Sequence, residues 1–109
     1  MDPESPFFAV EELPRDFLRP GTERRSIRLG EVQFMFISFD RPTVSPLHDH
    51  PHDSIIYVDR GEFEVTVGDE SRQLHPGEGV VAPAGVRHGL TTDAGARLIE
   101  VWYPIPRGQ

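Results

Sequence analysis

Proline and glycine occur throughout this chain and divide it into short segments. Its 109 residues include 11 prolines and 10 glycines, and no stretch of about twelve residues keeps the 3.6-residue apolar periodicity of a long helix. Proline also interrupts helices, because it lacks the backbone donor. We therefore expect short strands, with at most one helical turn within residues 11–18, where Pro14 limits it.

Several segments have the composition of β-strands. Residues 31–39 are apolar on both alternating faces, as in a strand between two packed layers or between a barrel and a partner subunit. Residues 62–67 alternate polar and apolar side chains before the turn Gly68-Asp69, which predicts a strand with one wet face. The other expected strands are 54–58, 79–82, 89–92 and 97–103. Many short strands at close spacing are typical of a sandwich or a barrel.

Charge and composition exclude several classes of partner. The net charge is −7, from 18 acidic and 11 basic residues, so phosphate backbones are repelled and we expect no nucleic-acid partner. The basic segment 24–28 is interpreted as a solvated strand face. No apolar run approaches the roughly 20 residues of a membrane helix, and residues 1–4 lack the basic start of a secretion signal. We expect a cytoplasmic protein with no membrane partner.

The histidines are the candidate metal ligands, because the chain contains no cysteine. Residues i and i+2 of a strand face the same way, so His48 and His50 can point together into a barrel. His88 follows the tight turn 83–87 and can enter from a neighbouring strand. Three imidazoles suit Zn, Fe, Mn, Ni or Cu and leave open positions for water or substrate. The alternative is three histidines satisfied inside a barrel that has lost its metal.

This histidine spacing resembles the cupin family. The first cupin motif, Gly-x5-His-x-His-x3–4-Glu-x6-Gly, is matched by His48, His50 and Gly61. The second, Gly-x5-Pro-x-Gly-x2-His-x3-Asn, is matched by Gly77, Pro83, Gly85 and His88. The resemblance implies an all-β double-stranded β-helix, or jelly-roll barrel, over residues 25–104. Residues 1–24 would then be an N-terminal segment that packs on a dimer partner, and residues 105–109 a C-terminal tail.

The match departs from the family at the fourth metal ligand. Ser54 stands where cupins place a metal-binding Glu or Gln, and a serine hydroxyl is a short, poor ligand. Asp53 is one residue away, which turns its side chain to the opposite face. His52 shares the parity of His50, and a bulge at Pro51 could bring it in. The expected site is three histidines plus water, with Ser54, Asp53 or His52 left open as a fourth ligand.

Residues 48–58 are also similar to one small single-domain group of cupins. That group reads His-x-His-x-His-Glu-Gln-x-x-Tyr-Val and includes the pectin- and alginate-degradation cupins, which convert unsaturated uronates to linear ketonates. The resemblance implies a metal that polarises a carbonyl or hydroxyl of a small, oxygen-rich substrate. The group's C-terminal strand carries an Asp and, two places on, an aromatic residue, which align with Glu100 and Trp102. A following arginine is close to Arg107.

Glu100 interrupts the apolar run 98–102, so it must be solvent-facing, paired or pocket-lining. Pointing inward near a metal, it could act as a catalytic general acid/base. The leading hypothesis is therefore a metal-dependent isomerase, ring-opening enzyme or lyase acting on a small molecule. The alternatives are an Fe(II)-dependent dioxygenase and a non-catalytic cupin that binds a small ligand. We expect a homodimer that uses strand 31–39 and the N-terminal segment.

Overall fold

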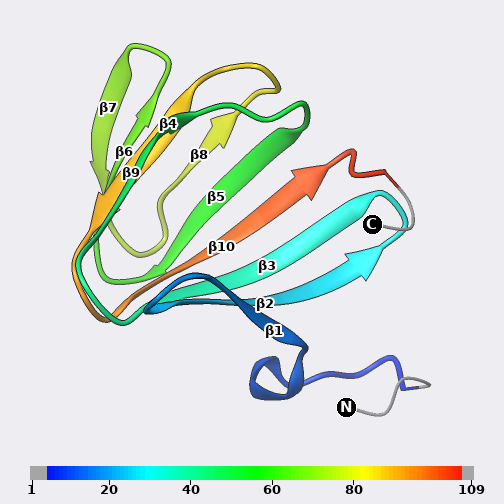
Figure 1. The fold of residues 1–109 in the computed structure, drawn as a ribbon. Coiled ribbons are helices and arrows are strands. Elements are labelled where there is room, and N and C mark those ends of the chain that lie inside the picture. The colour runs from blue at the N-terminus through cyan, green and yellow to red at the C-terminus, as the bar shows by residue number, and fades with distance from the viewer. Residues whose placement is uncertain (1–4, 107–109) are drawn as a thin grey trace.

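The structure is a computed structural model that describes residues 5–106, which form strands and one short 3-10 helix (Figure 1). Arg107 lies outside the described residues, as does part of the expected tail. The all-β expectation is confirmed. In chain order the elements are η1 (Val10–Glu12), β1 (Arg15–Arg19), β2 (Thr22–Leu29), β3 (Val32–Phe39), β4 (Thr43–His48), β5 (Asp53–Arg60), β6 (Phe63–Val67), β7 (Glu70–Leu74), β8 (Gly79–Ala82), β9 (His88–Thr92) and β10 (Ala96–Tyr103).

The strands form two antiparallel sheets. The larger has the order β1-β2-β3-β10-β5-β8, and the smaller has the order β4-β9-β6-β7. In Figure 1 the smaller sheet stands at the upper left, and the larger one runs from β8 down to β1. The core lies between them, where Phe39 of the larger sheet meets Phe63 of the smaller one edge to face, with ring centroids 5.4 Å apart.

Side-chain alternation along β3 shows how the sequence produces this core. Met35, Ile37 and Phe39 are buried, while Phe34 and Phe36, on the other face, are only half-buried. Successive side chains of a strand point to opposite faces, so the apolar residues of β3 supply the core on one side. On the other side they leave an apolar outer surface.

The first cupin motif ends at Gly61, in the connection from β5 to β6. Its φ of +78° lies in the region that favours glycine, and an added Cβ would meet the Cβ of Ala96 at 2.8 Å. Of the amino acids, only glycine fits both this backbone conformation and so close an approach. The motif glycine therefore lets the β5–β6 connection approach the start of β10 closely.

The N-terminal region differs from the sequence expectation. The helical turn covers only Val10–Glu12, and the chain after Pro14 becomes β1, which pairs with β2. Segment 24–28 is not a uniformly solvated face, because Arg24 lies beside the core residue Ile37 and lines an interior cavity. In residues 15–18, the pairing of β1 with β2 overrides the expected helical tendency. Among the described residues, no helix has the length and apolarity needed to cross a membrane.

Candidate metal centre

Three histidines converge at one end of the smaller sheet. His48 ends β4 and His88 begins β9, and the two residues are direct cross-strand partners. His50 follows in the loop after β4, so the expectation of a single strand carrying both His48 and His50 is wrong at that point. One ring nitrogen from each of the three lies within 4.8 Å of the others. The loop nevertheless places His50 beside His48 and His88.

Backbone carbonyls orient two of the rings. His48 Nδ1 lies 2.8 Å from the Pro46 carbonyl oxygen, and His88 Nδ1 lies 3.1 Å from that of Val86. A carbonyl only accepts, so each Nδ1 carries the proton and each Nε2 keeps its lone pair. Hydrogen bonds of this kind fix the tautomer and the ring orientation of metal-binding histidines.

Burial also favours the neutral imidazoles of His50 and His88. Desolvation, followed by the nearby imidazoles of His52, His48 and His88, lowers the pKa of His50 to about 4. Desolvation likewise lowers the pKa of His88, partly opposed by its backbone hydrogen bond to Val86. Only a neutral imidazole coordinates a metal. At neutral pH these side chains are therefore in the form that a divalent cation needs.

Asp53 lies outside the histidine cluster and helps to join the segment after His50 to the turn before His88. It is exposed, and its Oδ1 accepts the backbone N–H of Ala84 at 2.8 Å. The backbone N–H of Gly85 donates to the carbonyl of His50 at 2.9 Å. These two bonds tie the turn before His88 to the segment after His50. Asp53 thus acts on the turn, and its side chain faces away from the interior.

Ser54 faces the interior, as its spacing from Gly61 predicts. It is 1% exposed, and its Oγ has no hydrogen-bond partner among the described residues. Its cross-strand partner on β10 is Trp102. A buried hydroxyl without a partner is costly, so Ser54 Oγ is a polar atom on the inner face whose hydrogen-bonding capacity the described residues leave unused.

His52 packs against the cluster and is not one of its three members. Its ring stacks on that of His50 at 4.6 Å between centroids and lies 4.5 Å from the ring of Trp102. Its Nδ1 lies 3.2 Å from the Asp53 carbonyl oxygen. At 7% exposure, His52 is buried. The sequence predicted either a metal ligand or a rim residue at this position. In the structure, His52 is a buried residue that packs against the His50 ring.

The cluster opens into a cavity of about 390 Å³ between the two sheets. Glu100 lines this cavity, is 8% exposed, and accepts the indole N–H of Trp102 at 2.8 Å. Burial raises the pKa of Glu100, opposed in part by that hydrogen bond. Of the three placements the sequence allowed, the structure combines two, because Glu100 is both paired and pocket-lining. The other polar and aromatic residues that line the cavity are His48, His50, His88, Arg19, Arg24, Ser45, Phe39 and Trp102.

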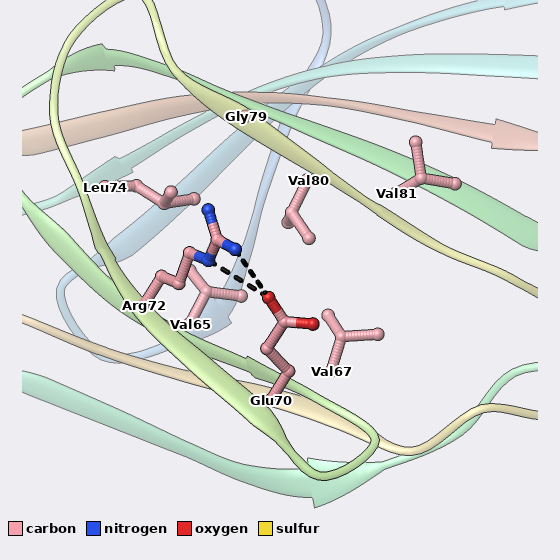
Figure 2. A pocket seen from close by; sticks show the side chains of 8 residues that line it. All are labelled: Val65, Val67, Glu70, Arg72, Leu74, Gly79, Val80 and Val81. Carbon is pink, nitrogen blue, oxygen red and sulfur yellow. Dashed lines mark hydrogen bonds and ion pairs between the residues drawn. The ribbon is translucent and has the colours of Figure 1, made fainter.

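A smaller cavity of about 240 Å³ lies between the β6–β7 hairpin and β8. Figure 2 shows that valine and leucine side chains line it and that Arg72 and Glu70 pair at its side. The guanidinium and carboxylate are 2.9 Å apart and largely exposed. No histidine lines this cavity. The candidate metal ligands line only the larger of these two cavities.

The donor set fits a divalent metal ion. Three neutral imidazole nitrogens within 4.8 Å can bind one ion while leaving positions open for water or substrate. His48, His50 and His88 would hold it, and the buried Ser54 hydroxyl lies on the same inner face of the fold. The metal's identity is not determined by this donor set.

We expect one metal ion per chain, lost when His48, His50 and His88 are all replaced by Asn, because one ring nitrogen of each lies within 4.8 Å of the other two. Elemental analysis after dialysis against Zn²⁺, Mn²⁺ or Ni²⁺ measures the ratio. The matched control is His75→Asn, since His75 is an exposed histidine paired with Glu78. A wild type that binds none of these ions would contradict the metal centre.

The same measurement repeated across pH has a defined direction. Protons compete with the metal for the imidazole lone pairs, so acid should release it. Because the pKa of His50 lies near 4, His50 stays available below the usual imidazole range. Metal should therefore be lost progressively between about pH 6 and pH 4, not in one step near pH 6.

We also expect Ser54→Glu and Ser54→Gln to tighten metal binding, with Glu the stronger because it adds a negative charge. Both would fill the partnerless inner position with an oxygen ligand. Competition with a chelator measures the affinity. Asp53→Glu is the control, since that side chain faces outward. Unchanged affinity in both Ser54 variants would show that position 54 does not reach the ion.

Comparison with known proteins identifies the family of the chain. Residues 35–102 match the family model of the cupin domain. The pectin degradation protein KdgF of Dickeya dadantii is 30% identical over 101 residues, which cover 90% of this chain and 92% of that protein.

Solved structures give the same answer at the level of the fold. The structure of KdgF from Halomonas sp. superposes with a TM-score of 0.84 at 31% identity and covers 94% of this chain and 96% of that one. An RmlC-like cupin from Shewanella frigidimarina has a TM-score of 0.85 at 27% identity, with 94% of each chain covered. The jelly-roll expectation is confirmed, and the chain belongs to the cupin family.

Proposed function

We propose that this protein is a metal-dependent enzyme that isomerises or opens a small, oxygen-rich substrate of the uronate class. The observation that carries the proposal is one cavity lined by both the three-imidazole cluster and a buried carboxylate, Glu100. The similarity to pectin degradation protein KdgF supports a sugar-acid substrate. A small-molecule partner fits a cavity of about 390 Å³.

The bound metal would act as a Lewis acid on a carbonyl or hydroxyl oxygen of the substrate. Glu100 would move the proton. Trp102 donates to Oε2 of Glu100, which orients the carboxyl group and leaves Oε1 for a substrate hydroxyl or carbon acid. Burial raises the pKa of Glu100, and a raised pKa suits a group that must both accept and return a proton near neutral pH.

We expect Glu100→Gln to lower turnover of an unsaturated uronate about 100-fold or more, because the amide cannot exchange a proton. Metal content and melting temperature should stay near wild type. The absorbance of the substrate's double bond follows the reaction. Glu64→Gln is the control, since Glu64 is an exposed carboxylate on β6. Near-normal turnover in Glu100→Gln would remove Glu100 from the chemistry.

The open metal positions also favour a second candidate, an Fe(II)-dependent dioxygenase. Three nitrogen ligands and a serine in place of the fourth would leave room for both oxygen and substrate. Oxygen uptake by the Fe(II)-loaded protein separates this candidate from the isomerase. A ligand that binds with neither turnover nor oxygen uptake would indicate a binding cupin. The cytoplasmic location stays a prediction.

We further propose that the protein is a homodimer through the outer face of the larger sheet. Phe34 of β3, Val101 of β10, Ile55 of β5 and Val81 of β8 are successive cross-strand neighbours in one row across this face. Ile55 is 52% exposed and Val81 is 59% exposed. An apolar row of this length on a sheet face is typical of an interface. The N-terminal segment stays a predicted part of it.

We expect Ile55→Glu to convert a dimer into a monomer, because it would bury a carboxylate in an apolar interface. Sedimentation equilibrium at tens of micromolar measures the mass. The control is Val44→Glu, since Val44 is 69% exposed on the other sheet. A wild type that sediments as a monomer would contradict the proposed interface.

A further inference from the structure

Arg24 is an arginine on the inner face of the fold that the metal chemistry does not use. It stands on β2 opposite the core residue Ile37 and lines the histidine cavity. Its side chain is 18% exposed. Long cations rarely occupy such positions without a partner, so the contacts of its guanidinium are informative.

One edge of the guanidinium is fully used by Asp16, its neighbour on β1. Nε donates to Asp16 Oδ1 at 3.0 Å and Nη2 donates to Oδ2 at 2.6 Å. This two-pronged pairing fixes the plane of the guanidinium. The mainly exposed carboxylate of Asp16 therefore holds Arg24 in place from outside the cavity.

Among residues 5–106, the remaining nitrogen has only a weak acceptor. Nη1 lies 3.9 Å from the sulfur of Met35, and a thioether is a weak acceptor. The guanidinium carbon lies 5.9 Å from the centroid of the Trp102 ring. That ring is 5.2 Å from the ring of His50. Arg24, Trp102 and His50 thus form one continuous wall, with the weakly bonded Nη1 donor at one end and the metal cluster at the other.

The residues that line the cavity are less acidic than the protein as a whole. The chain carries a net charge of −7, yet the charged residues that line this cavity, apart from its histidines, are Arg19, Arg24 and Glu100. Asp16 pairs with Arg24 from outside the cavity, so two cations are matched by two carboxylates, and a bound divalent metal would make the balance positive. Such a cavity attracts small anions.

We propose that Arg24 is a specificity-determining residue that binds a carboxylate group of the ligand through Nη1, while the ligand's oxygen atoms reach the metal at the other end of the Trp102 wall. Asp16 is the positioning residue for Arg24. The inference rests on the proposed function for its choice of an acidic sugar. It adds that edge strand β1, which lies outside the histidine motifs, helps to select the ligand.

The test compares two ligands that share a ring and differ in one group, D-galacturonate and D-galactose. Calorimetric titration of the zinc-loaded wild type should show tighter binding of the acid by about tenfold or more, the size expected for a charge-assisted hydrogen bond. Arg24→Gln should bring the two affinities within about twofold. Arg24→Lys keeps a cation for Asp16, and so protects the fold, but offers no second nitrogen; it should lose most of the preference too.

Arg25→Gln is a closely matched control. Arg25 is the next residue of β2, is 16% exposed, and is also ion-paired, to Glu23 at 3.0 Å. It stands opposite Phe36 and so faces the outer side of the sheet. Its replacement removes the same charge and a comparable ion pair, and the acid preference should remain.

Three results would overturn the inference: no acid preference in the wild type, preference kept in both Arg24 variants, or equal loss in Arg25→Gln. Metal content is measured on the same samples and separates the two proposals. One metal per chain with an acid preference independent of Arg24 defeats only this inference. An Arg24-dependent preference in a wild type that binds no metal defeats only the metal enzyme.

Discussion

The pairing of β4 with β9 determines where the site can form. It sets His48 directly opposite His88, and it requires the two strands to approach closely beside them. Gly89 allows this, because a Cβ there would meet the Ser45 carbonyl oxygen at 2.7 Å. The two hydrogen bonds that join the turn at 84–85 to residues 50 and 53 then hold His50 against that pair. The three donor atoms meet because the backbone is fixed on both sides.

The interior of the fold also sets the chemistry of the side chains within it. Removal from water lowers the pKa values of His50 and His88 and raises that of Glu100. Each shift favours the neutral form, which is the form that tolerates a weakly polar cavity. For the histidines the neutral form is a metal ligand, and for the glutamate it is a proton donor. Desolvation therefore favours the neutral form of both the histidines and the glutamate.

Strand parity made much of this site predictable. The two-residue period of β5 turns Ser54 inward and Asp53 outward, as the sequence indicated. Glu100 could be singled out because a charged residue in an apolar strand needs a partner or a wet pocket. The missed elements lack such a pattern. β1 is exposed along nearly its whole length, and β7 is polar except at Leu74. Their strand form comes from pairing with β2 and β6.

The sequence by itself determined the all-β architecture, the cupin motifs and the three histidines, because these depend on local periodicity and fixed spacings. The tertiary structure alone decided that Arg24 of β2 would face the same cavity as Glu100 and Trp102 of β10. These residues come together only after the larger sheet assembles, because β2 and β10 lie on either side of β3. Nothing in the local sequence encodes which side chain on a neighbouring strand will lie opposite. That depends on sheet order and register, which are properties of the whole fold.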